Sequence, residues 1–395
     1  MKPFQVLPHI HWIGALHPDL RIFDILMKTK NGTTYNSYLI QDEKTVVIDT
    51  VKEKFSDSYL DHISTLVNPE TIDYIIVHHS EPDHSGSLKA LLEIAKNAQV
   101  VCAKSAVKYV QNILNMDIDL HPVSNGDTLS LGNKTLTFIT SPYIHWPDTM
   151  MTYVNEDQIL FPCDLLASHF CDSRMFDDTI NRDFWPDFQY YFECIMRPYR
   201  KNVRNALAKL EPYDINIIAP SHGPILRQDI QRYIDAYREW SAPLPANDPP
   251  KMIVFYAAAH GNTERMAQAI AEGARNYGVD VELFDTMEFD IDGHLTRIEA
   301  ADALLFGSPT INNDAVKPVW DVLNSLATIE VKGKLGGSFG SYAWSGDAVK
   351  LLDDRLAALK FKVPFEGLQA LLVPNEEELN ACRQRGADIA QKLKS

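Results

Sequence analysis

Four side chains that can bind a metal lie within one six-residue run, His79-Ser-Glu-Pro-Asp-His84. An apolar stretch over residues 73–78 precedes the run and predicts a buried strand, and apolar residues spaced in helical steps over 88–95 follow it. Because side chains alternate along an extended backbone, we expect His79, Glu81 and Asp83 to point to one side of the loop. This density of imidazole and carboxylate groups predicts the start of a dinuclear metal site.

Three more metal-capable residues follow predicted strands farther along the chain. His145 lies in Tyr-Ile-His-Trp-Pro-Asp, Asp164 in Phe-Pro-Cys-Asp, and His222 in Pro-Ser-His-Gly-Pro. Three carboxylates with three or four imidazoles form a harder and more anionic site than a histidine-rich zinc hydrolase site. A bridging carboxylate suits an iron pair that cycles between the ferrous and ferric states.

The run from His79 resembles the first motif of the metallo-β-lactamase superfamily, His-x-His-x-Asp-His, with Glu81 in place of the second histidine. That replacement is the form found in flavodiiron proteins, also called A-type flavoproteins. The later candidate ligands match that family in the same order. The resemblance therefore implies an oxidoreductase with a diiron centre.

The resemblance also implies a role for each candidate ligand. His84 stays open, because its position is a ligand in hydrolases of the superfamily but not dependably in flavodiiron proteins. The remaining six residues are expected to be catalytic. His79, Glu81 and His145 would bind one iron, Asp83 and His222 would bind the other, and Asp164 would bridge the two.

Three loops in the second half of the chain carry groups that suit a flavin. A strand predicted over 252–256 runs into a glycine-containing loop, and a helix predicted over 263–277 follows, with Gly278 as the residue that ends it at C′. Backbone N–H groups at such a helix N-terminus bind phosphate. Two further loops follow the third and fourth predicted strands, at the sheet edge where ligands bind in a doubly wound fold.

These three loops are similar to the phosphate loop and the two isoalloxazine loops of flavodoxin, which implies FMN. Trp344 would flank the flavin ring; the alternative is an aromatic residue packed in the core. The first loop has fewer hydroxyl groups than the usual phosphate loop. The candidate FMN-binding residues are Ala257, Ala258, Ala259, His260, Gly261, Asn262, Thr263, Ser308, Pro309, Thr310, Ile311, Asn312, Asn313, Ser341, Tyr342, Ala343, Trp344, Ser345 and Gly346.

A proline-rich segment over residues 241–250 predicts a boundary between two domains. We expect residues 1–245 to form a metallo-β-lactamase-like αββα sandwich that holds the diiron site. Residues 251–395 show five apolar strand-like runs alternating with helical stretches, which predict a flavodoxin-like, doubly wound parallel sheet. The predicted fold class is thus α/β and α+β.

The composition excludes several other classes. The formal net charge of −16 argues against nucleic acid as a partner. No apolar run is long enough for a membrane span, and the N-terminus does not read as a signal peptide. The five scattered cysteines form no C-x-x-C pair, which favours free thiols in the cytoplasm over a disulfide framework or a zinc ribbon.

The resemblance implies reduction of dioxygen to water, of nitric oxide to nitrous oxide, or of both, with electrons passing through FMN. No rubredoxin-like segment follows the last predicted helix, so an external donor such as rubredoxin or a reduced deazaflavin coenzyme is expected. A head-to-tail homodimer, or a dimer of dimers, is implied by the resemblance alone. Two alternatives are a zinc-dependent hydrolase with a flavodoxin passenger domain and a non-enzymatic electron carrier.

Overall fold

The structure is a computed structural model that describes every residue of the chain except 26, 117, 289, 290 and 292. The chain forms two compact units, Met1–Ala242 and Pro243–Ser395, and the break falls inside the proline-rich segment. Among the described residues, no helix has the length and apolar character needed to cross a membrane.

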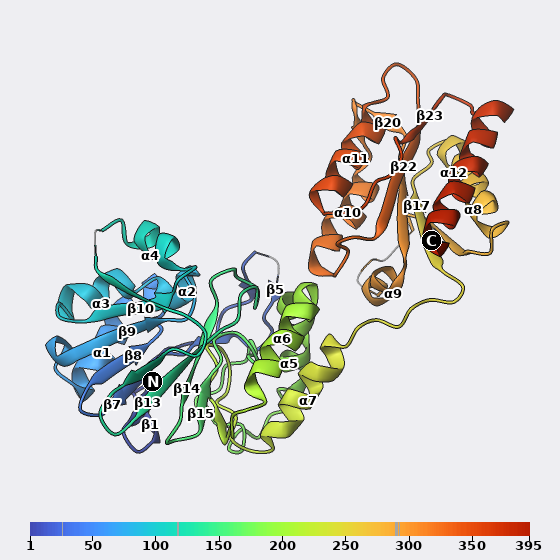
Figure 1. The fold of residues 1–395 in the computed structure, drawn as a ribbon. Helices are drawn as coiled ribbons and strands as arrows, with labels where there is room; N and C mark the ends of the chain where they lie inside the picture. The colour runs from blue at the N-terminus through green and yellow to red at the C-terminus, as the bar shows by residue number, and fades with distance from the viewer. Residues whose placement is uncertain (26, 117, 289–290, 292) are drawn as a thin grey trace. The chain divides into compact units, whose positions relative to one another are not determined.

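Two β-sheets form the centre of the first unit (Figure 1). The larger sheet has seven strands in the spatial order β1 (Phe4–Leu7), β2 (Ile10–Trp12), β7 (Tyr38–Gln41), β8 (Thr45–Ile48), β9 (Ile72–Val77), β10 (Gln99–Ala103) and β11 (Leu120–Val123). The smaller sheet has the order β12 (Thr128–Ser130), β13 (Thr135–Thr140), β14 (Met150–Val154), β15 (Ile159–Phe161) and β16 (Ile217–Ile218). Two short ribbons pair β3 (Ala15–His17) with β6 (Thr33–Tyr35) and β4 (Ile22–Phe23) with β5 (Met27–Lys28).

Helices cover the outer faces of these sheets, which gives an αββα arrangement (Figure 1). Beside the larger sheet lie α1 (Ser56–Leu66), α2 (Pro82–Ser85), α3 (Leu88–Ile94) and α4 (Val107–Leu114). Beside the smaller sheet lie α5 (Trp185–Tyr191), α6 (Arg200–Leu210) and α7 (Ile230–Ser241). Both faces of the central strands are therefore covered, and β9 reads as an almost unbroken apolar run for that reason.

The β-rich residues 35–40 and 45–49 predict a hairpin, and β7 and β8 form one, pairing antiparallel with Tyr38 opposite Ile48. Tyr35, however, belongs to β6 and pairs with β3. Strands β6 and β7 are separated at Asn36, whose backbone N–H donates to Ser221 O at 2.8 Å rather than to a neighbouring strand. This break brings β6 beside the loop that follows β16.

The second unit contains the parallel sheet that the sequence predicts. Its strands all run parallel, in the order β18 (Asp280–Asp285), β17 (Lys251–Tyr256), β19 (Ala303–Gly307), β22 (Leu335–Tyr342) and β23 (Leu368–Leu371). A short ribbon, β20 (Thr310–Ile311) with β21 (Asp314–Ala315), extends one of the loops. One face is covered by α8 (Asn262–Arg275) and α12 (Glu376–Lys394), and the other by α9 (Leu295–Ala300), α10 (Lys317–Ser325) and α11 (Asp347–Ala358).

Candidate functional site

The end of β9 decides which of two adjacent histidines faces the site. His78 donates its backbone N–H to Oδ1 of Asp49 at 2.8 Å. Its ring contacts Oδ2 of Asp49 and Oγ1 of Thr152, each at 2.8 Å. Because successive side chains of extended backbone point to opposite sides, His79 then faces the other way, towards the remaining candidate ligands.

The expectation of an extended loop through Asp83 is wrong. Residues Pro82–Ser85 form one helical turn, α2. Proline suits the first position of such a turn, and the Ser85 hydroxyl donates to the carbonyls of Ser80 and Glu81, each at 2.9 Å. The turn presents Asp83 and its neighbour His84 from a rigid base rather than by strand alternation.

Asp164 lies between two groups of candidate ligands and faces each with one oxygen. Its Oδ2 atom is 2.9 Å from Nε2 of His79 and 2.9 Å from Nε2 of His145. His145 Nε2 is in turn 3.2 Å from Oε2 of Glu81. These four residues form one half-site, with all their ligand atoms within 4.8 Å of one another.

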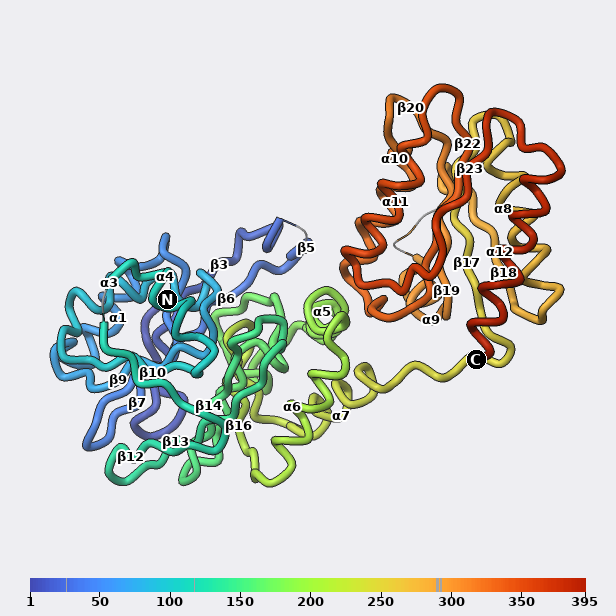
Figure 2. The backbone as a smooth tube through the Cα atoms, turned by 45° about the horizontal axis from the view of Figure 1, so that its top comes forward, coloured from blue at the N-terminus to red at the C-terminus, as the bar shows by residue number. Residues whose placement is uncertain are grey.

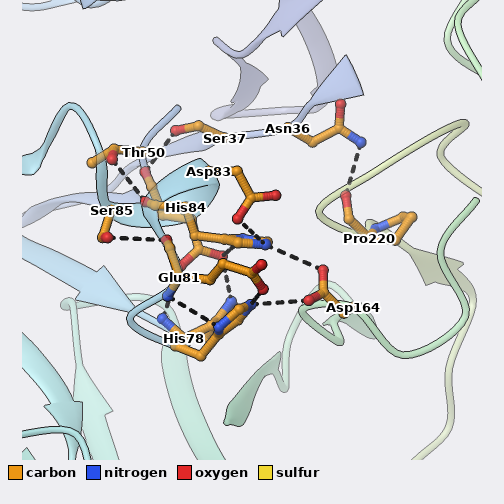
Figure 3. Close-up of polar contacts among 12 residues, drawn as sticks. Asn36, Ser37, Thr50, His78, Glu81, Asp83, His84, Ser85, Asp164 and Pro220 are labelled. Carbon is orange, nitrogen blue, oxygen red and sulfur yellow. Dashed lines mark hydrogen bonds and ion pairs between the residues drawn. The ribbon is translucent and has the colours of Figure 1, made fainter. Parts of the chain in front are cut away.

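The other oxygen of Asp164, Oδ1, faces the second group. It is 3.2 Å from Nε2 of His84 and 3.5 Å from Nε2 of His222. Oδ2 of Asp83 is 3.1 Å from the same His222 nitrogen. Figure 3 shows Asp83, His84 and Asp164 directed at one another. His84, left open by the sequence, is therefore part of the cluster in this structure.

The donor set fits a pair of cations. In the part of the chain that the structure describes, four of these buried atoms have no hydrogen-bond partner: Asp83 Oδ1 and Oδ2, His84 Nε2 and Asp164 Oδ1. They approach other ligand atoms at ion-pair distances but are not aligned as hydrogen bonds. Buried charged groups without partners are costly, and a metal ion is what usually satisfies them.

In the metal-free cluster, neighbouring charges and hydrogen bonds shift the pKa values of the candidate ligands. Burial would raise the pKa of Asp164, but the charges of His84 and His79 hold it well below its ordinary value. Burial would lower the pKa of His145, yet hydrogen bonds to Asp164 and Glu81 raise it to about 10. Without metal, these interactions favour an imidazolium at His145 and a carboxylate at Asp164.

Three residues at the site have left-handed backbone, with φ of 54° at Asp49, 41° at His145 and 56° at Cys163. Such angles are uncommon outside glycine and asparagine and cost free energy. Cys163 immediately precedes Asp164, which lies between the two groups of candidate ligands, and Asp49 supports the end of β9. Strained backbone of this kind is concentrated at functional sites.

The three candidate flavin loops come together at the carboxyl end of the parallel sheet. Thr263 Oγ1 at the start of α8 lies 3.1 Å from Ser341 Oγ, which joins the first loop to the third. Ser345 Oγ donates to Asn313 Oδ1 at 3.0 Å, which joins the third loop to the second. Gly261 has φ of 76°, a conformation that favours glycine, and its backbone is open to a ligand.

Trp344 is 73% exposed, so it is not an aromatic residue of the core. A large exposed aromatic side chain between two polar loops is consistent with stacking on a planar ligand. His260 and Ala259 are also exposed, whereas Ala257 is buried at the end of β17. The alanines of this loop leave its backbone N–H groups as the main donors for a phosphate.

Comparisons with known proteins agree with both halves of this description. Residues 33–223 match the ODP family beta lactamase model, and residues 254–386 match the flavodoxin model. A type A flavoprotein of Rhodobacter capsulatus is 43% identical over 99% of this chain and 92% of its own length. A flavo-diiron protein of Clostridium acetobutylicum is 39% identical over 100% of both chains. The chain belongs to the flavodiiron protein family.

Two further relatives indicate the chemistry found in the family. A protein of Moorella thermoacetica named nitric oxide reductase is 35% identical over 99% of both chains. The solved rubredoxin oxygen:oxidoreductase of Desulfovibrio gigas is 29% identical, with a TM-score of 0.70, and covers 100% of this chain and 99% of its own. This flavodiiron protein is accordingly an oxidoreductase, its cofactors are FMN and a diiron centre, and its predicted fold class is confirmed.

Sequence reasoning missed an aromatic wall around His222 in this flavodiiron protein. Ring centroids of His169, Phe23, Tyr35 and Tyr191 lie 5.2, 5.6, 5.8 and 6.3 Å from that of His222. All four wall residues are buried. They come from separate segments without a shared motif, and the contact between β6 and the loop after β16 brings Tyr35 beside His222.

Asp24 was missed as well. Burial, followed by a hydrogen bond and the charge of Glu81, raises the pKa of Asp24 to about 7. Asp24 lies next to the β4–β5 ribbon, and its φ of 44° turns the chain over the site. A lone aspartate between apolar residues carries no signal in the sequence that separates it from an ordinary turn residue.

Proposed function

We propose that this chain reduces dioxygen to water, nitric oxide to nitrous oxide, or both, using electrons that reach the iron site through FMN. The observation that carries the proposal is the carboxylate of Asp164, which faces one ligand group with each oxygen. A bridge of this kind suits two metal ions held close together. When bound, the iron pair supplies the redox chemistry, and FMN supplies it with electrons.

We propose a ligand set for each iron from the distances in the cluster. His79, Glu81 and His145 would hold one iron. Asp83, His84 and His222 would hold the other, with Asp164 shared by both. The chain's own contribution is to fix these seven side chains on rigid elements, to exclude bulk water by burial and to offer a small aromatic wall beside His222.

The flavin loops support the FMN part of the proposal. The helix N-terminus of α8, with Gly261 before it and Thr263 after it, would hold the phosphate. Trp344 would stack on the flavin ring. The remaining candidate residues of the three loops would contribute backbone donors and side-chain hydroxyl groups to the same site.

We further propose an external electron donor, either rubredoxin or a reduced deazaflavin coenzyme, and a head-to-tail homodimer as the working unit. The acidic net charge of −16 would attract a donor with a basic surface. All five cysteines are free thiols, which supports the cytoplasm as the place of action.

A gas-consumption assay tests the function. Iron-replete, FMN-replete protein would be reduced anaerobically with a rubredoxin and its reductase, and then given dioxygen or nitric oxide in separate runs. Rapid dioxygen loss with little peroxide marks an oxygen reductase, and nitrous oxide formation marks a nitric oxide reductase. Consumption of neither gas, also after direct chemical reduction of the protein, contradicts the proposal; esterase or lactamase turnover with zinc would favour the hydrolase.

A further inference from the structure

Reduction of either gas consumes protons as well as electrons, so a buried iron site needs a route for protons. Dioxygen takes up four protons to become two waters, and two nitric oxide molecules take up two to become nitrous oxide and water. Six of the seven candidate ligands are buried, and the side chain of the seventh, His145, is 15% exposed. A chain of hydrogen-bonded side chains from the surface is the usual means of moving protons into such a site.

One such chain begins at Lys54, an exposed residue of the short helix Glu53–Phe55. Its Nζ atom lies 2.8 Å from Nε2 of His17. Nδ1 of His17 lies 3.3 Å from the hydroxyl of Tyr35, which is only 1% exposed. Three side chains therefore join the solvent to the interior in two hydrogen bonds.

The β3–β6 ribbon sets this arrangement (Figure 2). His17 is opposite Thr33 in the antiparallel register, so Tyr35 is its diagonal neighbour on the same face. The ring of Phe55 lies 5.3 Å from that of His17 and 5.5 Å from that of Tyr35. This apolar ring packs against both members of the chain and limits their contact with water.

The direction of the chain follows from the donor inventory. A lysine ammonium only donates, so Lys54 must donate to Nε2 of His17. A neutral His17 then carries its proton on Nδ1 and donates it to the oxygen of Tyr35. Burial, together with the charges of Lys54 and Lys52 and against that of Asp19, lowers the pKa of His17, which favours the neutral ring.

Because Nδ1 of His17 donates to the Tyr35 oxygen, the proton of the Tyr35 hydroxyl is free to be donated to another acceptor. Among the described residues, the structure gives this hydroxyl no partner besides His17. The Tyr35 ring meets the edge of His222 at a centroid distance of 5.8 Å. Thr34, the preceding residue of β6, accepts from His222 Nδ1 through its carbonyl at 2.6 Å, so the same strand holds the ligand and carries the phenol.

We propose that Lys54, His17 and Tyr35 form a proton relay that supplies the gas-reducing site. Tyr35 gives its phenolic proton to a water or substrate oxygen in the site and takes one from Nδ1 of His17. His17 takes one at Nε2 from Lys54, which is reprotonated by solvent, while the electrons arrive separately through FMN. The inference rests on the proposed function.

Four full-length variants test the relay: Lys54→Met, His17→Phe, Tyr35→Phe and the control Lys52→Met. Lys52 also places a positive charge near His17 but makes no hydrogen bond to it. We expect turnover of the preferred gas to fall at least ~10-fold in the three relay variants. The solvent deuterium isotope effect on turnover should rise in these three variants, while their iron and FMN content and their anaerobic rate of flavin reduction stay unchanged. Lys52→Met should match the wild type in all of these measurements.

A second readout does not depend on turnover. Nitrogen-15 NMR of histidine-labelled, metal-free, full-length protein should show His17 protonated on Nδ1, with the His17→Phe spectrum as assignment. In Lys54→Met the ring should lose this single tautomer. Turnover at the wild-type rate in His17→Phe and Lys54→Met, or an Nε2-protonated His17, overturns the relay; a wild-type protein that consumes neither gas overturns the proposed function and the relay with it.

Discussion

Asp164 contacts both halves of the candidate metal site. Its two oxygens face His79 and His145 on one side and His84 and His222 on the other. Replacing it by alanine, Asp164→Ala, removes the shared ligand and leaves the surrounding imidazoles without their strongest partner. We expect iron content to drop below half and gas turnover to fall by at least ~100-fold, since even outer-shell changes cost 10–100-fold.

FMN content should stay at the wild-type level in Asp164→Ala, because the flavin loops belong to a separate compact unit. Metal analysis and flavin absorbance on the same sample measure both quantities. Asp57→Ala, an exposed aspartate in the first turn of α1, is the control and should leave both unchanged. Full iron retention in Asp164→Ala would contradict the bridging role.

Protonation of the cluster should compete with metal binding. Hydrogen bonds to Asp164 and Glu81, acting against burial, raise the pKa of His145 to about 10, so the metal-free protein holds this imidazole protonated at pH 7. A ligating imidazole must be neutral, so binding ferrous iron releases this proton. The apparent affinity should therefore rise about tenfold per pH unit between roughly pH 7 and 9.

The stability of the metal-free protein should change with pH in the opposite direction to its affinity for iron. The pKa of His145 is raised above its unfolded value, so its contribution to the stability of the metal-free protein is present at low pH and lost as pH rises through about 10. Anaerobic calorimetry in buffers of different ionisation enthalpy counts the released protons. His62→Gln, which alters a histidine bonded to Ile13 O away from the cluster, should leave the count unchanged; a pH-independent affinity would contradict the prediction.

At the scale of single residues, the sequence predicted the metal-capable residues but not all of the residues that surround them. His79, Glu81 and Asp83 could be read from one short run, because their types and spacing are unusual. The partners that hold or surround them could not. Tyr35 and His222 are 187 positions apart in the chain, and no periodicity relates a strand residue to a loop that packs on it only after folding.

Among the elements, the loop after β16 depends on one buried amide. The Asn36 side chain donates to Pro220 O at 2.8 Å (Figure 3). It also donates to Gly223 O at 2.9 Å and accepts from Trp12 Nε1 at 2.9 Å. These bonds join β2, the connection from β6 to β7, and the loop that carries His222. The loop position is thus fixed from outside the metal site.

Asn36→Ala leaves the Gly223 carbonyl and the Trp12 indole N–H buried without these partners, while the Pro220 carbonyl keeps the hydrogen bond from the Tyr38 hydroxyl. We expect the free energy of unfolding of the first unit to fall by about 2–3 kcal/mol, and iron to dissociate faster, because His222 loses its fixed position. Urea denaturation followed by circular dichroism and iron release to a chelator measure the two effects. Asn155→Ala, whose exposed amide also donates to a carbonyl, Thr135 O, is the matched control and should cost less than about 0.5 kcal/mol.

It was easier to predict that a strand is present than to predict how it connects to the next element. The apolar runs predicted β9 and the five parallel strands, because buried strands need continuous apolar sequence. The break at Asn36 and the helical turn at Pro82 could not be read in this way. Both are set by hydrogen bonds to distant or local carbonyls, and these outweigh the intrinsic preference of the residues concerned.

For the whole molecule, the proposed head-to-tail dimer makes a prediction about which chain feeds which iron site. If FMN of one chain serves the iron site of the other, two different defects can compensate. Asp164→Ala should keep FMN but lose the iron site. Gly261→Asp places a carboxylate in the phosphate loop, at a φ of 76° that aspartate tolerates better than most residues, and should lose FMN but keep iron.

Each variant alone should be inactive, since each lacks one of the two cofactors in every chain. Mixed by co-expression or by unfolding and refolding together, half of the dimers are heterodimers, and each heterodimer has one working pair of sites out of two. Turnover should therefore recover to about a quarter of the wild-type rate. Native mass spectrometry of the mixture, in which the two variants differ in mass, serves as the control for subunit exchange. If electrons instead pass from FMN to iron within one chain, no mixture of the two variants recovers any activity, because no single chain then carries both cofactors.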